Sequence, residues 1–493
     1  MMSEHPLDPI FHPRTVALFG APSNPDAWGS MFGQAMIDTG YDRDRMFLIN
    51  PKADRIGDMP AYHTLTDVPE PVDHVISLVP AKVVPELVDQ CIAKGVRSLH
   101  LFTAGFSETG DDEMARVERD SVARLKAAGI RTIGPNCMGL YVPASGLTFG
   151  SEFPMESGKI FLVSQSGANA SEIVRTLTPR GVRFSKVVSF GNGADLKAHD
   201  FFDYAASDPD TEIVISYLEG VPDGRELFEA LKRCAAAKPT IILKGGLSGA
   251  GARAASSHTG SLAGSREIFE ALCRQTGAIR VDSMEELQDL TVAMATGARR
   301  VSARRVVLVG GPGGFAVLSS DAIAAQGLEL PETPEEAKKE LREFIPVAGT
   351  SVNNPIDAHP RGKEQMERTM RALAGSGSYD VVFSTSLGID PWRRPGRRGG
   401  SSTDETPEER EKRIAEETEQ AREGARLLES LQSELDVPII YVQRSGWNGG
   451  GDRSASAAFE HNIATFPSVA RAAHAVARIL EWRERRRGLP EIF

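Results

Sequence analysis

The chain has 493 residues, 41% of them hydrophobic and 25% charged, as in ordinary globular proteins, and this length predicts roughly three domains. The formal net charge of −11 argues against a nucleic-acid binder held by a global positive field. The four scattered cysteines form no CxxC pair, which indicates a reducing compartment and no zinc or other metal site. No signal-peptide pattern and no apolar run of about 18 residues is present, so we expect a cytoplasmic protein without a membrane span.

Short apolar runs alternate with helix patterns over the first 137 residues. Strands are predicted at 14–20, 46–50, 74–79 and 98–103, and helices at 29–39, 83–95 and 112–128. Such alternation indicates a doubly wound parallel sheet, whose ligands bind beyond the carboxyl ends of the strands. The segments expected at that edge are Gly20–Pro25, Asn50–Lys52, Val79–Pro80, Thr103–Phe106 and Gly134–Cys137.

The first strand lacks the glycine pattern of a nicotinamide-dinucleotide fold. Gly20 is present, but the second and third glycines of GxGxxG are missing. The second strand ends in Asn50-Pro-Lys52 and not in the acidic residue that would accept from a ribose hydroxyl. Lys52 suits a phosphorylated nucleotide, with a solvated surface lysine as the alternative. Dinucleotide binding is therefore the weaker interpretation.

A second unit begins near residue 157. Strand 159–164 leads through Gln165-Ser166-Gly167-Ala168 into a helix ending at 177, and further strands are predicted at 186–189, 212–218 and 240–243. The Ser-Gly turn offers backbone donors and a hydroxyl to a phosphate, although an ordinary helix N-cap explains the same residues. Glu219 follows the strand 212–218, where its carboxylate could orient an imidazole or cap the next helix.

One histidine, His258, lies among small residues in the run 254–264, shortly after Lys244-Gly-Gly. Small residues let a backbone approach an anionic ligand closely, and the apolar positions that follow predict a helix whose first turn favours phosphate. A neutral imidazole beside a phosphate can accept the phosphoryl group, whereas the alternative is a surface-loop histidine. Two phosphate-friendly turns, Glu219 and His258 converge on one edge, which favours the first interpretation.

A third unit begins near residue 303. A strand at 305–309 enters a glycine-rich turn and a helix at 315–326, further strands are predicted at 380–387 and 437–442, and a helix covers about 468–487. Between these strands, 389–432 has the composition of an insertion, with four arginines and then a charged helix with glutamates and arginines four residues apart. We interpret it as a solvated face or partner contact.

Taken together, these segments resemble the NDP-forming acyl-CoA synthetases, relatives of succinyl-CoA synthetase, over about residues 8–480 apart from 389–432. The run Ser257–Gly264 is similar to the phosphohistidine loop of that family, Ser164–Gly167 to its phosphate turn, and Tyr217–Gly220 to the segment with the histidine's carboxylate partner. Motifs of the family's CoA domain are matched at 20–25, 50–52, 79–81, 103–108 and 134–139.

The resemblance implies an α/β protein with three doubly wound parallel-sheet units. These are a Rossmann-like CoA-binding domain (1–150), a flavodoxin-like domain with the phosphohistidine loop (151–298) and a second flavodoxin-like domain with the insertion (299–493). It implies that His258 is phosphorylated with the support of Glu219, and that the phosphate is held by Ser166, Gly167, Ala168, Thr259 and Gly260. The CoA-binding residues it implies are Gly20, Ser23, Asn24, Pro25, Asn50, Lys52, Val79, Pro80, Thr103, Ala104, Gly105, Pro135, Asn136 and Cys137.

Two departures from the family pattern shape the expected function. Gly193 stands where relatives often place a charged residue, which bears on substrate choice, and no ATP-grasp segment is found. The resemblance therefore implies an acid–CoA ligase for a small carboxylic acid, joined in a hetero-oligomer to an ATP-grasp subunit that binds Mg²⁺ and ATP/ADP or GTP/GDP. The alternatives are a non-catalytic CoA- or acyl-CoA-binding regulatory subunit and a related acyl- or carbamoyl-transferring protein.

Overall fold

The apolar runs of the N-terminal region form one seven-stranded sheet in the order β3–β4–β2–β1–β5–β6–β7. Neighbouring strands are parallel except for the hairpin of β3 and β4. The strands are β1 (Val16–Phe19), β2 (Met46–Ile49), β3 (Arg55–Ile56), β4 (Met59–Tyr62), β5 (His74–Ser77), β6 (Ser98–Leu101) and β7 (Arg131–Ile133). The helices of this region are α1 (Asp8–Phe11), α2 (Ser30–Asp38), α3 (Val84–Lys94) and α4 (Asp112–Ala127).

A second sheet of six strands has the order β13–β12–β11–β9–β10–β8. It is parallel except at its edge, where β8 pairs antiparallel with β10. Its strands are β8 (Gly139–Tyr141), β9 (Ile160–Ser164), β10 (Phe184–Ser189), β11 (Ile213–Leu218), β12 (Thr240–Lys244) and β13 (Ile279–Val281). Its helices are α5 (Gly167–Leu177), α6 (Ala198–Ser207), α7 (Gly224–Ala237) and α9 (Arg266–Thr276), and α10 (Met284–Met294) follows β13 toward the third sheet.

The third sheet has four strands, all parallel, in the order β14–β15–β16–β17. They are β14 (Val306–Val309), β15 (Val381–Ser384), β16 (Ile439–Val442) and β17 (Ala464–Phe466). The helices around this sheet are α11 (Gly313–Ala325), α12 (Glu335–Arg342), α13 (Gly362–Ala374), α14 (Pro407–Leu435), α15 (Arg453–Glu460) and α16 (Val469–Arg485). The predicted α/β class with parallel sheets is confirmed, with two antiparallel pairs that the prediction did not include.

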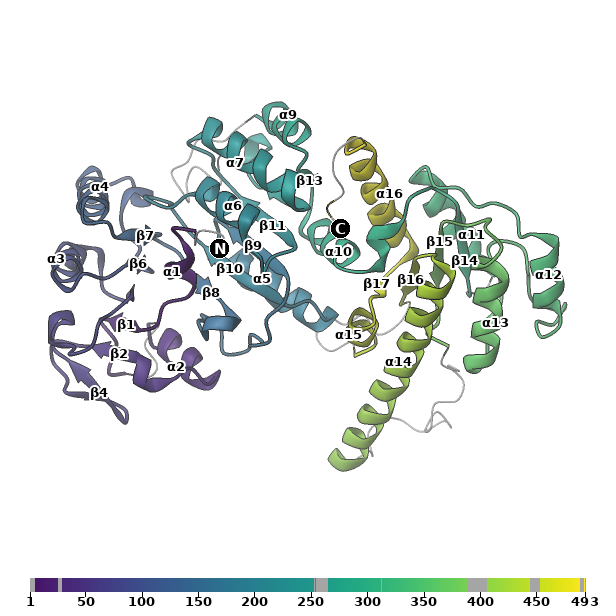
Figure 1. Cartoon of the computed structure of the whole chain (residues 1–493), viewed down its shortest axis with the longest axis horizontal. Helices are drawn as coiled ribbons and strands as arrows, with labels where there is room; N and C mark the ends of the chain where they lie inside the picture. The colour runs from purple at the N-terminus through teal and green to yellow at the C-terminus, as the bar shows by residue number, and fades with distance from the viewer. Residues whose placement is uncertain are drawn as a thin grey trace. The chain divides into compact units, whose positions relative to one another are not determined.

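The computed structural model describes residues 5–24, 29–251, 253, 265–311, 313–388, 406–443, 453–487 and 492 (Figure 1). It divides into two compact units. Unit 1 holds the first two sheets and consists of residues up to 175 together with 183–287 and 490–493. Unit 2 consists of 176–182 together with 288–489. None of the described helices has the length and apolar composition that crossing a membrane requires.

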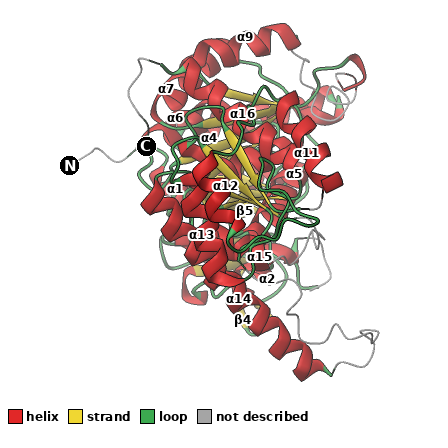
Figure 2. Ribbon diagram, turned by 90° about the vertical axis from the view of Figure 1, so that its right-hand side faces the viewer, coloured by secondary structure: helices red, strands yellow, loops and turns green. Residues whose placement is uncertain are grey.

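The first sheet has its main core where α3 and α4 pack side by side on one face (Figure 1). Leu87 and Cys91, one helical turn apart on α3, and Leu125 on α4 are fully buried against strand residues such as Val75 and Leu99. Helices flank strands in this way throughout (Figure 2). Because both faces are covered, the central strands read as continuous apolar runs, which is why the sequence identifies them.

The helix α14 is only partly the solvated element that the sequence predicts. Its residues 407–420 contain no buried position, and an i,i+4 ion pair joins Arg413 to Glu417. From Ala421 onward, however, the helix is buried in the core of unit 2, through Ala421, Ala425, Leu428 and Leu431. Residues 389–405 lie outside the described part of the chain. The buried stripe escaped the sequence analysis because glutamates and arginines surround it.

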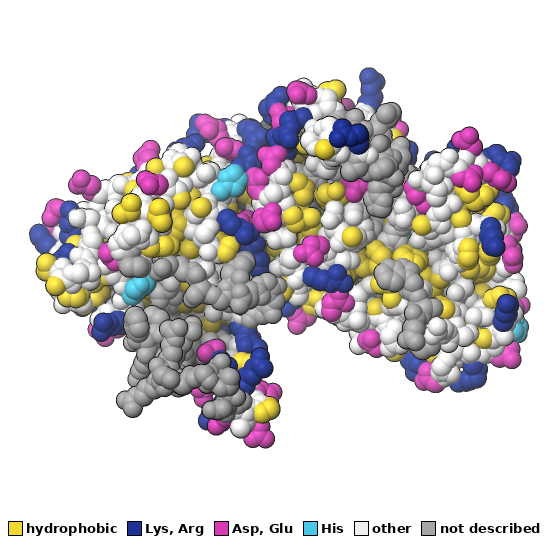
Figure 3. Space-filling model, turned by 180° about the vertical axis from the view of Figure 1, so that it is seen from behind, with side chains coloured by type: hydrophobic (Ala, Val, Ile, Leu, Met, Phe, Trp, Pro, Cys, Tyr) yellow, Lys and Arg dark blue, Asp and Glu magenta, His cyan; other side chains and the backbone are white. Residues whose placement is uncertain are grey.

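Charges of both signs are interspersed over the surface of the face in Figure 3, where no field of one sign stands out. Opposite charges pair repeatedly along the chain, for example Arg371 with Glu367 and Glu434. A protein that binds a polyanion nonspecifically needs a continuous positive surface instead.

Candidate functional site

A cavity of about 540 Å³ opens in unit 1 where strand ends of both sheets meet. Its lining comes from the segments after β5, β6 and β7 in the first sheet and after β9, β10 and β11 in the second. The lining residues are Leu78, Val79, Pro80, Phe102, Thr103, Ala104, Asn136, Cys137, Met138, Gln165, Ser166, Gly167, Ala168, Gly191, Asn192 and Glu219. Ten of these residues are among those that the sequence analysis singled out.

Hydrogen bonds hold the strand-end loops of the first sheet to one another. The Thr103 hydroxyl donates to the backbone carbonyl of Val79 at 2.8 Å, and the Asn136 N–H donates to the carbonyl of Thr103 at 2.9 Å. Gly20, at φ +82°, lies so close to this edge that a Cβ would stand 2.4 Å from Cγ1 of Val79. The predicted edge of the sheet therefore exists as one connected surface.

Some predicted residues of that edge lie outside the cavity lining. The Asn50 side chain donates to the Ala21 carbonyl at 2.9 Å and accepts from the Lys52 N–H at 2.9 Å, which shapes the loop after β2, and the Lys52 side chain is exposed. Pro25 lies outside the described residues. The described predicted residues that do not line this cavity are Gly20, Ser23, Asn24, Asn50, Lys52, Gly105 and Pro135.

The turn after β9 combines a helix cap with a set of backbone donors. Ser166 caps α5, since its hydroxyl accepts from the Asn169 N–H at 3.3 Å, and Ser164 Oγ accepts from the Ser166 N–H at 3.2 Å. In the described residues, the first-turn N–H groups of Gly167 and Ala168 have no acceptor, and both residues line the cavity. The two interpretations of this turn, cap and phosphate cradle, are thus compatible.

Glu219 is buried at the cavity wall just after β11, with 9% of its surface exposed. Its N–H donates to Oε1 of Gln165 at 2.8 Å, as does the N–H of Gly220 at 2.9 Å. Its carboxylate lies near the phenol of Tyr217, which in turn lies near the side chain of Asn169. The turn after β9 therefore holds the backbone of the turn that carries this carboxylate.

Two further ionisable groups adjoin Glu219. Burial raises the pKa of Tyr217 to about 12, and the nearby carboxylate adds to that shift, so the phenol stays a donor at neutral pH. The buried ammonium of Lys244 donates to the backbone carbonyls of Glu219 and Gly245. Burial lowers the pKa of Lys244, and the Glu219 charge opposes that shift. One ammonium group and one phenol therefore interact electrostatically with the same carboxylate.

The turn after β10 closes the cavity against the first sheet. Asn192 donates from its N–H to the Pro135 carbonyl at 3.0 Å and from its side chain to Glu108 at 2.7 Å. Gly191, at φ +54°, is so close to that loop that a Cβ would stand 2.2 Å from the Pro135 carbonyl oxygen. Asn192 and Gln165 are functional candidates that the sequence analysis missed, although Gln165 lies inside the quoted phosphate turn and Asn192 precedes Gly193 directly.

Cys137 lines the cavity but is not a nucleophile there. Its side chain is 5% exposed, and burial raises the pKa of its thiol, so the reactive thiolate is not populated at neutral pH. Its backbone carbonyl accepts a hydrogen bond from Nε2 of His100 at 3.1 Å, which holds the loop in place.

His258, Thr259 and Gly260 lie outside the described residues. The chain that leads to them leaves β12 at Lys244, beside the Glu219 turn, and the chain that follows them enters α9. Ser265 caps that helix through its hydroxyl, which accepts from the Ile268 N–H at 3.4 Å. The helix predicted after the histidine run is confirmed.

Three family models match consecutive parts of the chain. Residues 14–143 match a CoA binding domain, residues 157–294 a succinyl-CoA ligase like flavodoxin domain, and residues 306–373 a ligase-CoA domain. The first two of these segments contain all the residues that line the cavity.

Curated relatives cover most of the chain. The alpha subunit of acetate–CoA ligase (ADP-forming) II from Pyrococcus furiosus is 35% identical over 77% of this chain and 82% of its own length. Acetate–CoA ligase (ADP-forming) I from Archaeoglobus fulgidus is 36% identical, and 4-hydroxybutyrate–CoA ligase (ADP-forming) from Nitrosopumilus maritimus is 35% identical. The chain spans about half of these two longer relatives, 54% and 50% of their length.

A solved structure extends the likeness to nearly the whole chain. It is a dinucleotide-forming acetyl-coenzyme A synthetase 1 from Candidatus Korarchaeum cryptofilum, in complex with phosphate and ADP. The TM-score is 0.77 at 27% identity, and the match covers 98% of this chain and 97% of that one.

Proposed function

This chain belongs to the ADP-forming acyl-CoA ligases, and on that premise we propose that it is their alpha-type subunit, which interconverts an acyl-CoA and phosphate with a carboxylic acid and CoA. The observation that carries the proposal is the cavity of unit 1. It unites CoA-domain loops, the Ser166–Gly167 turn and Glu219 at one place. We further propose that the chain has three domains, with limits at 1–150, 151–298 and 299–493.

The proposed reaction begins at the thioester. Phosphate attacks the acyl carbonyl, the C–S bond breaks, and CoA leaves as a thiol once a proton reaches its sulfur. Binding CoA is assigned to the strand-end loops of the first sheet, including Val79, Thr103 and Asn136. The product, an acyl phosphate, then lies beside the turn whose Gly167 and Ala168 N–H groups face the cavity.

In the second step His258 attacks phosphorus. The N–P bond forms, the P–O bond to the acyl group breaks, and the carboxylate leaves with its electron pair. Glu219 would accept the imidazole N–H, fixing the tautomer and stabilising the positive charge that develops on the ring. A covalent relay of this kind divides one difficult transfer into two easier ones.

The third step passes the phosphoryl group to a nucleoside diphosphate. We propose that the nucleotide, with Mg²⁺, binds on a separate ATP-grasp subunit and that the assembly is a hetero-oligomer. The alpha-subunit names of the Pyrococcus furiosus relatives and the ADP in the related solved structure support this division. The acetate and 4-hydroxybutyrate relatives support a small carboxylic acid as substrate.

The proposal is tested by incubating the chain with radiolabelled phosphate and acetyl-CoA. We expect a phosphoprotein that is labile to acid and stable to base, as a phosphohistidine is, and we expect His258→Ala to take no label. The variant His63→Ala, which removes an exposed histidine of unit 1, serves as the matched control and should be labelled like the wild type.

The proposal would be contradicted by a wild-type chain that binds CoA but takes no label. The label is offered both as phosphate with a panel of acyl-CoAs and as ATP with the ATP-grasp subunit. That result would favour a regulatory CoA-binding subunit.

A further inference from the structure

Gln165 connects the two turns that form the transfer site. It stands between β9 and Ser166 and is buried, with 7% of its surface exposed. Its backbone N–H donates to the Tyr217 carbonyl at 2.9 Å, and its Oε1 accepts from the N–H groups of Glu219 and Gly220. One side chain thus ties the phosphate turn to the turn that carries Glu219.

These bonds fix the orientation of the Gln165 amide. Two N–H donors converge on one end of it, and only the carbonyl oxygen can accept from both. The NH₂ group must therefore occupy the other end. Among the described residues, no acceptor is hydrogen-bonded to this NH₂ group. The group is also not one of the described polar atoms that are fully buried without a partner. Because Gln165 lines the cavity, its NH₂ group is a donor to whatever the cavity holds.

The donor has two neighbours of the same kind. Gly167 and Ala168 line the same cavity, and their first-turn N–H groups have no acceptor among the described residues, so the turn offers three neutral donors. A transferring phosphoryl group carries its charge on three oxygens that are not bonded to the attacking or leaving atom. Fixed dipoles aimed at such oxygens stabilise them without having to reorganise during the reaction.

We propose that Gln165 is a catalytic residue of the phosphoryl transfer, whose NH₂ group donates to an oxygen of the moving phosphoryl group while its carbonyl holds the Glu219 turn. This inference rests on the proposed function and adds to it a residue with two simultaneous tasks. No bond to Gln165 forms or breaks in either step.

The test compares Gln165→Glu with the wild type in the labelling reaction with phosphate and acetyl-CoA. The introduced carboxylate can still accept from the two backbone N–H groups, but it has no donor and carries a negative charge. We expect the labelling rate to fall by about 10²–10³-fold at neutral pH. The rate should recover partly as the pH is lowered, since the protonated carboxyl regains one O–H donor. The KM for acetyl-CoA should stay unchanged.

Two further variants complete the design. Gln365→Glu makes the same chemical change in α13 of unit 2, where Oε1 accepts from the Arg361 N–H at 2.8 Å, and should label normally. Gln165→Met removes donor and acceptor together and should show no pH recovery. If Gln165→Glu fails to fold, the phosphate KM of Gln165→Met decides instead. A phosphate KM more than about tenfold above that of the wild type, with the acetyl-CoA KM unchanged, supports the role of the NH₂ group as a donor. An unchanged phosphate KM overturns that role.

The outcomes separate the inference from the function on which it rests. The inference is overturned if Gln165→Glu is labelled at the wild-type rate. It is also overturned if the labelling rate of Gln165→Glu falls to that of Gln165→Met and does not recover at lower pH. Either result leaves the proposed function intact. A wild-type chain that takes no label overturns the proposed function itself.

Discussion

Among single residues, Glu219 shows how environment converts an ordinary side chain into a candidate for chemistry. A carboxylate after a strand is common, but the backbone of Glu219 is held by Gln165, and the phenol of Tyr217 lies near its carboxylate. Lys244 adds a buried positive charge beside the same turn. Such support matters because a partner for an imidazole must keep both its position and its negative charge.

We expect Glu219→Gln to lower the rate of labelling by about 10²-fold, because the amide keeps the shape of the side chain but loses the charge that stabilises an imidazolium. Rapid-quench labelling with phosphate and acetyl-CoA measures the rate. Glu226→Gln, on the exposed face of α7, is the control and should match the wild type. Equal rates in Glu219→Gln and the wild type would contradict the assigned role.

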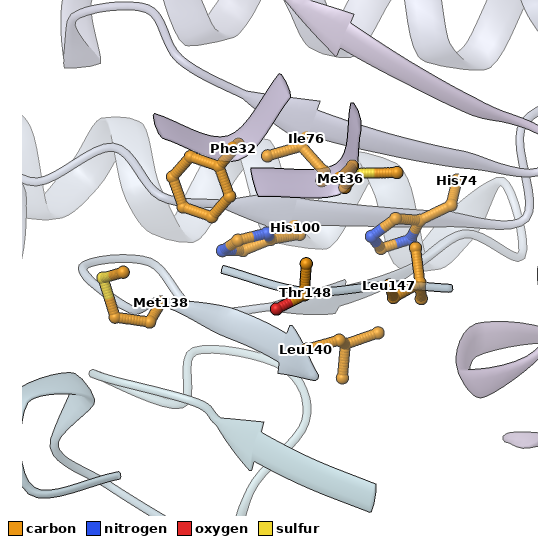
Figure 4. A pocket seen from close by; sticks show the side chains of 9 residues that line it. All are labelled: Phe32, Met36, His74, Ile76, His100, Met138, Leu140, Leu147 and Thr148. Atoms are coloured by element: carbon orange, nitrogen blue, oxygen red, sulfur yellow. The ribbon is translucent and has the colours of Figure 1, made fainter. Parts of the chain in front are cut away.

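At the scale of elements, β5 and β6 carry two histidines into the interior of unit 1. Figure 4 shows the His74 and His100 rings side by side, facing Leu140, Leu147 and Thr148 across a cavity of only about 10 Å³. His74 is bonded to Ser98 at 2.7 Å through Nδ1, and its Nε2 has no partner in the described residues. Because His100 donates to the Cys137 carbonyl, this packing also supports the loop that lines the main cavity.

The burial of these rings predicts a pH-dependent stability. Burial lowers the pKa of His74 to about 3 and that of His100 to about 4, whereas both titrate near 6.5 in the unfolded chain. As the pH falls below about 6.5, the unfolded state binds protons first. The free energy of unfolding should therefore fall by up to about 1.4 kcal/mol per pH unit for each ring until about pH 4.

Urea unfolding of the chain at about pH 7 and about pH 5 measures the effect. Partial desolvation also lowers the pKa of the exposed His12, which adds in the same direction. The double variant His74→Gln, His100→Gln should show a clearly smaller difference between the two pH values. A pH dependence equal to that of the wild type would show that other groups cause it.

On the scale of the whole molecule, the chain contributes to unit 2 twice. A short segment, 176–182, joins the long stretch 288–489. Arg180, in the 3-10 helix Thr178–Arg180, donates to Asp289 on α10 at 3.0 Å and to the Thr465 carbonyl on β17 at 2.9 Å. Arg471 on α16 donates to the same carboxylate at 2.8 Å. One buried acidic group thus unites segments far apart in the sequence.

Replacing that group should destabilise unit 2 strongly. Asp289→Asn keeps the volume of the side chain but leaves two arginines without their counter-charge, which we expect to cost about 3–5 kcal/mol. Hydrogen exchange of the β16 and β17 amides, read by mass spectrometry, measures the local loss of protection. Asp436→Asn, which breaks an exposed pair with Arg300, should cost less than about 1 kcal/mol. Unchanged protection in Asp289→Asn would contradict the assignment.

The sequence by itself predicted most of the parallel strands in their order along the chain and the types of residue at the strand ends, but it did not predict β3, β4, β8, β13 or β17. Apolar runs, the Ser166–Gly167 turn and Glu219 are local signals, because hydrogen bonding and side-chain periodicity act over a few neighbouring residues. The match of these signals to one family was sufficient to place ten of the sixteen cavity residues.

Only the tertiary structure decided which of these signals meet. The bonds from Glu219 and Gly220 to Gln165 exist because β9 and β11 are neighbours in the sheet. The contact of Asn192 with Glu108 exists because strand-end loops of two sheets meet. The antiparallel β8 and the buried half of α14 likewise depend on distant partners. Such contacts arise from strand order and packing over tens of residues, and no local pattern in the chain encodes them.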